Sequence, residues 1–341
     1  MIEIKKINSN ENDFLKILEN HTRKRIKNTS GVKERVKNII SEVRNYGDDA
    51  LLRFSKEFDN FDVSEPKEFE ISKKEFSESL PKISKKELDA LSFAKKRIEE
   101  FSNHQKSESW MYSSDGIQLG EKVTPIEKVG IYVPGGLAVY PSSVLMNSVP
   151  AKVAGVKEII MVVPSPGGHV SNLVLAAAHL GGVDRLFKIG GAQAIAALAI
   201  GTKTIPKVNM IVGPGNQYVA EAKKELYGEV GIDSFAGPSE ILVIADTDAN
   251  PEWIAADLFS QAEHDELAQA VLISPDQNLL DKVEKIINKT IFAQERKEII
   301  KSSLENFGLL IKSKNITDAI NISNELAPEH LQLSIKNSED Y

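Results

Sequence analysis

The stretch Val129-Gly130-Ile131-Tyr132-Val133-Pro134-Gly135-Gly136 marks the point at which this 341-residue chain changes character. Its first five residues predict a buried strand, which the proline and the two glycines end at a tight turn. Similar apolar runs, separated by stretches with helical spacing, continue to the end of the chain, and this alternation is typical of a parallel sheet wrapped by crossover helices. The predicted strands are residues 129–133, 158–163, 185–189, 208–212, 240–245, 270–274, 309–311 and 331–335.

The first four of these strands and the last four form two series, which predict two α/β halves with a crevice between them. Residues 1 to about 105 are highly charged and have helical periodicity, so we interpret them as a helical layer. We therefore expect an α/β fold with two Rossmann-like parallel-sheet halves and an N-terminal helical segment. In this division, residues 1–128 pack with 239–341 as one domain, and residues 129–238 form a second, inserted domain.

Composition excludes several classes of function. Asp and Glu exceed Lys and Arg by 49 to 42 without any basic stripe, which disfavours a nucleic-acid partner. The chain begins without an apolar targeting segment and contains no apolar run long enough to cross a bilayer, so we expect a cytoplasmic protein without a membrane partner. The chain has no cysteine, so an aldehyde oxidised here has to react with water instead of a thiol.

Three glycine-containing turns follow predicted strands, at residues 134–136, 190–193 and 213–216. In Gly213-Pro214-Gly215-Asn216, backbone amides and the helix dipole can meet a phosphate or another polar group. The turn is not a dinucleotide fingerprint, because Tyr218 stands where the third glycine belongs, and a plain strand-to-helix turn explains it equally well. Since all three turns lie at the carboxyl ends of parallel strands, we favour a shared ligand crevice.

Two polar pairs are candidates for chemistry. Gln261 and His264 lie three apart on a predicted helix that begins after Asn250-Pro251, so both side chains leave the same face at a metal-ligand spacing. Glu329 and His330 follow a proline at a bend, and such a pair can divide acid and base work. The alternatives are a surface histidine near a helix end and an exposed polar turn.

Taken together, the motifs resemble the histidinol dehydrogenase family, in the family's order and from about residue 30 onward. The resemblance rests on VGIYVPGG at 129–136, GGAQAIA at 190–196, VGPGN at 212–216, AGPSE at 236–240, SQAEH at 260–264 and APEHL at 327–331.

This resemblance implies a zinc-dependent oxidation of L-histidinol to L-histidine through the aldehyde, with two NAD reduced in turn. It implies zinc ligands at Gln261 and His264, which with Ser239 and His330 also contact the substrate. NAD contacts are implied at Tyr132, Gln193 and Asn216. Glu329 and His330 match the catalytic pair, which we expect to meet the zinc pair on one cleft.

The family's chains continue for roughly ninety residues, which include a helical domain and two more zinc ligands, Asp and His, the latter donated across a homodimer. Because three protein ligands are usual for catalytic zinc, we expect the 341-residue chain alone to bind zinc poorly and to have little activity. Two alternatives stay open, namely a related dehydrogenase of another small alcohol and a non-catalytic α/β binding or dimerisation module.

Overall fold

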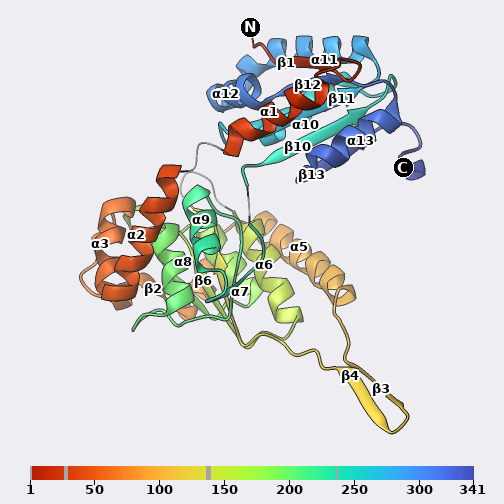
Figure 1. The fold of residues 1–341 in the computed structure, drawn as a ribbon. Coiled ribbons are helices and arrows are strands. Elements are labelled where there is room, and N and C mark those ends of the chain that lie inside the picture. Colours follow the sequence, from red (N-terminus) through yellow and green to blue (C-terminus); the bar gives the residue numbers. More distant parts are fainter. Residues whose placement is uncertain (1, 27–29, 136–139, 236) are drawn as a thin grey trace. The chain divides into compact units, whose positions relative to one another are not determined.

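The computed structural model describes residues 2–26, 30–135, 140–235 and 237–341. Contacts within the chain divide it into two compact units: unit 1 comprises Met1–Thr29 and Gly237–Tyr341, and unit 2 comprises Ser30–Ala236. Each unit has its own central parallel sheet (Figure 1). The expected α/β fold with two Rossmann-like parallel sheets is confirmed.

The sheet of unit 2 has the order β2-β7-β6-β5-β8-β9, with only β2 antiparallel to its neighbour among the described strands. From β7 to β9 this is the doubly wound order 3-2-1-4-5. The strands β6 and β7 are added on one side of β5 and the strands β8 and β9 on the other, so the strand order reverses between β5 and β8. The strands are β2 (Glu70–Ile71), β5 (Lys128–Tyr132), β6 (Glu158–Val162), β7 (Arg185–Phe187), β8 (Met210–Val212) and β9 (Gly231–Ile232).

Helices cover both faces of this sheet because consecutive strand residues are buried on opposite sides. In β6, Ile160 and Val162 join the core formed with α2, α3, α8 and α9, whereas Ile159 and Met161 join the core formed with α4, α5, α6 and α7. The helices are α2 (Ser30–Tyr46), α3 (Asp48–Asp59), α4 (Lys73–Ser79), α5 (Lys85–His104), α6 (Pro141–Val153), α7 (Asn172–Gly181), α8 (Gly191–Ile200) and α9 (Gln217–Leu226).

An antiparallel hairpin of β3 (Trp110–Ser114) and β4 (Ile117–Glu121) extends away from the sheet of unit 2 (Figure 1). All ten of its strand residues are exposed. The cross-strand register places the apolar residues Trp110, Tyr112, Ile117 and Leu119 on one face. The sequence interpretation contained no strand here.

The sheet of unit 1 is parallel throughout, in the order β1-β12-β11-β10-β13. One face packs on α10, α11 and α12, and the other on α1 and α13. The strands are β1 (Lys5–Asn8), β10 (Glu240–Ala245), β11 (Gln269–Ser274), β12 (Leu309–Lys312) and β13 (His330–Ser334). The helices are α1 (Phe14–Ile26), α10 (Pro251–Ala262), α11 (Gln277–Thr290), α12 (Lys297–Phe307) and α13 (Ile316–Leu326).

The N-terminal part of the chain differs from the predicted division. Residues 30–128 belong to unit 2, where α2 packs on α8 and α9 and α5 packs on α6. Only the first 29 residues join unit 1, and they include the strand β1, which was predicted to be helical. The apolar stripe of α2, with Val36, Ile39 and Val43 buried, does not encode which sheet it covers, and this is why the prediction was wrong.

Candidate functional site

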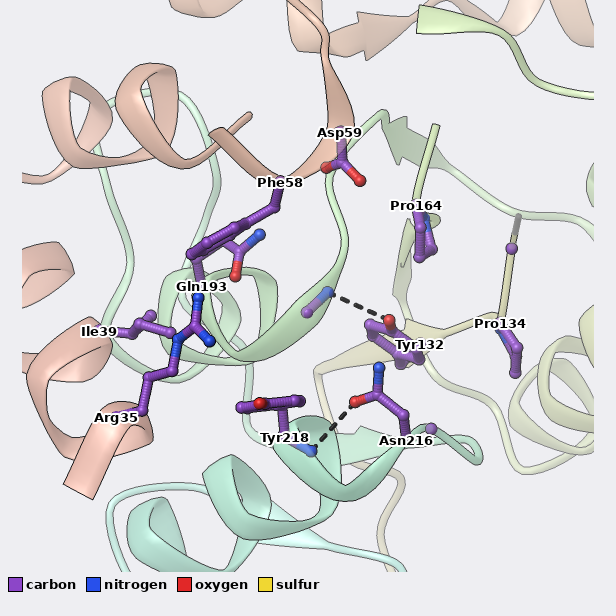
Figure 2. A pocket seen from close by; sticks show the side chains of 13 residues that line it. Arg35, Ile39, Phe58, Asp59, Tyr132, Pro134, Pro164, Gln193, Asn216 and Tyr218 are labelled. Atoms are coloured by element: carbon purple, nitrogen blue, oxygen red, sulfur yellow. Dashed lines mark hydrogen bonds between the residues drawn. The ribbon is translucent and has the colours of Figure 1, made fainter. Parts of the chain in front are cut away.

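A cavity of about 360 Å³ lies in unit 2, where strands β5, β6, β7 and β8 end (Figure 2). It includes the point between β5 and β8 at which the strand order reverses, the usual ligand position in doubly wound sheets. The three glycine turns predicted to share a crevice all contribute to its lining, through Gly135, Gly191 and Gly215. Gly136 of the first turn lies outside the described residues.

Two of the glycines are needed because other groups approach the backbone closely. Gly191 has a φ of +66°, and a Cβ there would lie 2.7 Å from Oε1 of Gln193. Gly213 has a φ of +109°, and a Cβ there would lie 2.1 Å from the carbonyl oxygen of Tyr132. A side chain at Gly213 would push the ends of β8 and β5 apart, and one at Gly191 would displace the amide of Gln193, so either would change the shape of the cavity.

The three residues matched to NAD contacts line this one cavity, although they come from three different elements. Tyr132 ends β5, and its hydroxyl accepts a hydrogen bond of 3.1 Å from the backbone N–H of Gly191. Burial raises the pKa of Tyr132 to about 12, so the hydroxyl keeps its proton. Gln193 lies in the first turn of α8 with 2% of its surface exposed.

Asn216 caps α9 and also faces the cavity. Its Oδ1 accepts hydrogen bonds from the backbone N–H groups of Tyr218 at 3.0 Å and Val219 at 3.2 Å. These bonds fix the orientation of the amide, because only the oxygen can accept them. The Nδ2 group is therefore directed upward toward Tyr132, where it can donate to a ligand (Figure 2).

A buried cation braces the turn after β8, which the sequence did not reveal. Lys223, with 4% of its side chain exposed, forms an ion pair with Asp233 and donates to the carbonyl oxygen of Gly213 at 3.1 Å. Asp233 in turn accepts from the backbone N–H of Gly213 at 2.8 Å. The pair therefore holds both backbone groups of this glycine in place.

Four more residues of the cavity come from the N-terminal helices and were also missed as site residues, namely Arg35 and Ile39 of α2 and Phe58 and Asp59 of α3. Arg35 of α2 lies between two rings, with Cζ 5.4 Å from the centroid of Phe58 and 5.7 Å from that of Tyr218. Asp59, at the end of α3, is next to Phe58 in the lining. No local motif marks these positions, because their role depends on how α2 and α3 pack on unit 2.

The second group of predicted residues lies in unit 1, at the amino-terminal edge of its sheet. Ser239 directly precedes β10, and Glu329 and His330 lie at the start of β13. Gln261 lies in the last turn of α10, which runs back from the carboxyl ends of the strands. The helix ends at Ala262, two residues earlier than predicted, but a hydrogen bond of 3.1 Å from His264 N to Gln261 O keeps His264 in a turn beside it.

Glu329 and His330 are both held against Glu240, the first residue of the neighbouring strand β10. The backbone N–H of each glutamate donates to the Oε2 of the other at 3.3 Å. His330 Nδ1 lies 3.0 Å from the carbonyl oxygen of Glu240 and 3.7 Å from Oε2 of Glu329. Because a carbonyl oxygen only accepts, this hydrogen bond requires the proton on Nδ1 and leaves Nε2 free to take a proton.

The register places His330 on the same face of the sheet as α10. His330 pairs with Ile241, which packs in the core with Ile254 and Leu258 of α10. Two residues along β13, Gln332 donates to Oδ2 of Asp257 at 2.7 Å.

His330 lies two residues before Gln332 on β13, a distance of about 6.6 Å along the strand. Gln261 lies four residues after Asp257 on α10, a distance of about 6 Å along the helix. Because α10 runs antiparallel to the strand, both residues are displaced from the Gln332–Asp257 contact in the same direction. The predicted metal pair and the predicted acid–base pair therefore lie at one edge and on one face.

Gln261 and His264 fit part of a zinc shell. An amide oxygen and an imidazole nitrogen are zinc donors, and the described residues form no hydrogen bond with either side chain. Over the same described ranges, no group of three His, Cys, Asp or Glu side chains is arranged to hold a metal. Gln261 and His264 therefore fit as two ligands of a zinc ion whose remaining ligands are supplied by other donors.

No described helix is long and apolar enough to span a bilayer.

Comparison with known proteins points to one family. The family model described as histidinol dehydrogenase matches residues 22–341. The histidinol dehydrogenase of Pseudomonas fluorescens is 50% identical over 97% of this chain and 75% of its own length, and that of Nitrosomonas europaea is 48% identical over 100% and 79%. The crystal structure of histidinol dehydrogenase from Elizabethkingia anophelis matches all of this chain and 78% of its own, with 34% identity and a TM-score of 0.90. The chain thus belongs to the histidinol dehydrogenase family, whose members are oxidoreductases of histidine biosynthesis.

Proposed function

We propose that this chain, once other donors complete its zinc shell, oxidises L-histidinol to L-histidine through the aldehyde, with unit 1 supplying the acid–base groups and unit 2 binding NAD. The observation that carries the proposal is His330, whose Nδ1 is fixed by the Glu240 carbonyl so that Nε2 is a free base. Glu329 stands beside it as a second base, and both side chains are more than half exposed to a substrate. The chemistry needs no thiol, in keeping with a chain that has no cysteine.

In the first oxidation, Nε2 of His330 takes the hydroxyl proton of the alcohol while a hydride leaves the carbon. NAD, when bound, supplies the hydride acceptor for this step and for the second one. The Nδ1 hydrogen bond to Glu240 stabilises the imidazolium that forms, because the proton on Nδ1 gains charge next to an acceptor.

In the second oxidation, Glu329 takes a proton from the water that adds to the aldehyde, and the imidazolium of His330 returns its proton to the aldehyde oxygen, which gives the hydrate. His330, neutral again, then takes a hydroxyl proton of the hydrate as the second hydride leaves, and the carboxylic acid that forms loses its proton to solvent as the carboxylate product. Ser239, which lies at the same edge, is proposed to contact the substrate.

The cavity in unit 2 is the proposed NAD site. It offers the amide of Gln193, the free Nδ2 of Asn216 and the hydroxyl of Tyr132 to one ligand. The amino end of α8 adds to these, because no side chain caps it and its dipole favours a phosphate.

Gln261 and His264 would hold zinc together with other donors, and zinc would fix the orientation of the substrate's imidazole and amine. Zinc titration by calorimetry tests this part by itself. The variants Gln261→Ala and His264→Ala should each weaken zinc binding, and Gln277→Ala, an exposed glutamine at the start of α11, is the control.

The activity is tested by following NADH formation with L-histidinol and with a sulfonated diol as substrates. We expect formation of about two NADH per histidinol, the stoichiometry of a four-electron oxidation. A higher rate with the sulfonated diol would instead assign the chain to a related dehydrogenase. Zinc and NAD binding without turnover of either alcohol would argue for a binding module.

We also propose that the partner is a second copy of this chain. The hairpin β3–β4 supports this, because its apolar face with Trp110, Tyr112, Ile117 and Leu119 is exposed. Replacing Trp110 and Tyr112 by Ser should lower the molar mass measured by light scattering from dimer to monomer. Met111→Ser, on the opposite face, should leave it unchanged, and a dimer that survives the double replacement would rule out this face.

A further inference from the structure

Asp59 is a buried carboxylate in the wall of the unit 2 cavity. It is the last residue of α3, and Asn60 in the left-handed conformation turns the chain directly after it. Only 9% of Asp59 is exposed, and among the described residues no group donates a hydrogen bond to its Oδ2. Figure 2 shows the carboxylate directed into the cavity, between Phe58 and Pro164.

A carboxylate at this position is costly to the fold. Burial raises the pKa of Asp59 to about 6, so the side chain is ionised at neutral pH although none of the described residues donates a hydrogen bond to its buried Oδ2. The negative charge also helps to raise the pKa of Tyr132. A buried acceptor that the protein leaves unsatisfied and directs into a cavity calls for donors from a ligand.

The proposed ligand of this cavity carries such donors. Each ribose of NAD has two adjacent hydroxyls, which match the two oxygens of one carboxylate. A phosphate on a ribose, as in NADP, would bring a second negative charge to the same oxygens, and like charges in a desolvated site repel strongly.

We propose that the Asp59 carboxylate binds a ribose diol of the dinucleotide and makes the cavity selective for NAD over NADP. This inference rests on the proposed NAD site and adds to it a residue outside the family motifs quoted above. In doubly wound folds the ribose-binding acid usually follows the second strand of the sheet. Here it comes from a helix that precedes the whole sheet in the sequence.

Calorimetry with NAD, NADP, ADP and nicotinamide mononucleotide tests the proposal on three proteins. These are the full chain, Asp59→Asn and the control Asp62→Asn, which removes an exposed carboxylate three residues further along. We expect Asp59→Asn to weaken NAD binding at least about tenfold, since it removes charge-assisted hydrogen bonds. Asp59→Asn should also reduce the ratio of the affinity for NAD to the affinity for NADP. Asp62→Asn should change neither the NAD affinity nor this ratio.

The two mononucleotides identify which ribose is bound. A loss confined to ADP places the adenosine ribose at Asp59, and a loss confined to nicotinamide mononucleotide places the other ribose there. Equal NAD binding by the full chain and Asp59→Asn would overturn this inference and leave the NAD site standing. Absence of NAD binding in all three proteins would overturn both.

The pH dependence of binding separates a ligand contact from a structural role. NAD affinity of the full chain should fall as the pH is lowered through about 6, where Asp59 takes up a proton, and that of Asp59→Asn should not. The other titratable groups of the cavity are Arg35 from α2, Tyr132 from β5 and Tyr218 from α9. Guanidinium and phenol groups ordinarily keep their charge state over this range. A flat profile in the full chain would contradict the proposal.

Discussion

The two units share an architecture but carry their candidate sites at opposite edges of their sheets. Unit 2 has its cavity at the carboxyl ends of β5, β6, β7 and β8, as doubly wound sheets usually do. Unit 1 gathers Ser239, Gln261, His264, Glu329 and His330 at the amino-terminal edge. Topology alone therefore does not decide where a ligand binds.

The helix starts contribute to this difference. In unit 1, three of the helices that follow strands are capped by a side chain, Asn250 on α10, Asp276 on α11 and Asn315 on α13. In unit 2, α6 and α8 begin without a side-chain cap, whereas Ser171 caps α7 and Asn216 caps α9. A capped helix start has used backbone donors that a ligand would need, so the start of α8 in the unit 2 cavity keeps donors for an anion that the capped starts of α10, α11 and α13 do not.

Replacing His330 should have the largest effect, and it should distinguish most clearly between the catalytic task of unit 1 and the NAD-binding task of unit 2. His330→Asn removes the base, so we expect kcat to fall about 10²- to 10⁴-fold. NAD binding measured by calorimetry should stay unchanged, because the NAD cavity belongs to unit 2. Gln332→Asn, two residues along the same strand, is the control and should change kcat far less. A loss of NAD affinity in His330→Asn would contradict the assignment of the two tasks to separate units.

Removing the Lys223–Asp233 ion pair, which holds the turn at Gly213 in unit 2, should have the next largest effect. Lys223→Met removes the buried cation from Asp233, whose side chain is 32% exposed, and the loss of such a charged hydrogen bond costs about 1.5–3 kcal/mol. The free energy of unfolding, measured by urea denaturation, should fall by about this amount. NAD affinity should fall as well, because the carbonyl of Gly213 loses its donor.

Lys224→Met, at the next position on α9, is exposed and serves as the control. If Lys223→Met loses stability but keeps full NAD affinity, the brace supports the fold and not the cavity.

Much of this comparison was predictable from the sequence. The apolar runs predicted the strands β5 to β8 and β10 to β13, because buried parallel strands are marked by composition, but they did not predict the short strands β1, β2 and β9. The glycine turns predicted the crevice of unit 2, since the carboxyl ends of parallel strands meet at one edge.

Other parts depend on packing that the sequence does not encode locally. β1 has four residues and is half exposed, so its pairing with β12 leaves little pattern. Asp59 ends a charged helix and resembles any solvated carboxylate until α3 is placed over the cavity. The support of His330 by Glu240 depends on strand register, which joins residues 90 positions apart.

The unpaired charge of Asp59 predicts that the unit 2 site lowers stability. Its pKa of about 6 lies above the ordinary aspartate value of 3.8, so the folded state binds more protons than the unfolded state between these values. Stability therefore falls as the pH rises from 4 to 6 and stays lower above 6, by up to about 3 kcal/mol.

Asp59→Asn removes this penalty and should raise the free energy of unfolding at pH 8 by about 2–3 kcal/mol, with little gain at pH 4. Urea denaturation at the two pH values measures it, with Asp62→Asn as the control. A variant that is more stable yet binds NAD less well is the expected mark of a residue kept for binding. Equal stability of Asp59→Asn and the full chain at pH 8 would show that the charge has a partner.

The smallest effect compares one cap from each unit. Asn216→Ala and Asn315→Ala each remove a side chain that accepts from the first turn of a helix, and each should cost about 1 kcal/mol of stability. Only Asn216 also presents its Nδ2 to a ligand, so only Asn216→Ala should weaken NAD binding, by about tenfold for one hydrogen bond. Asn216→Asp keeps the cap but replaces the donor with an acceptor, so it should retain stability and lose affinity. If Asn216→Asp binds NAD as well as the full chain does, Asn216 acts only as a cap, and the two units differ less at their carboxyl edges than the cavity suggests.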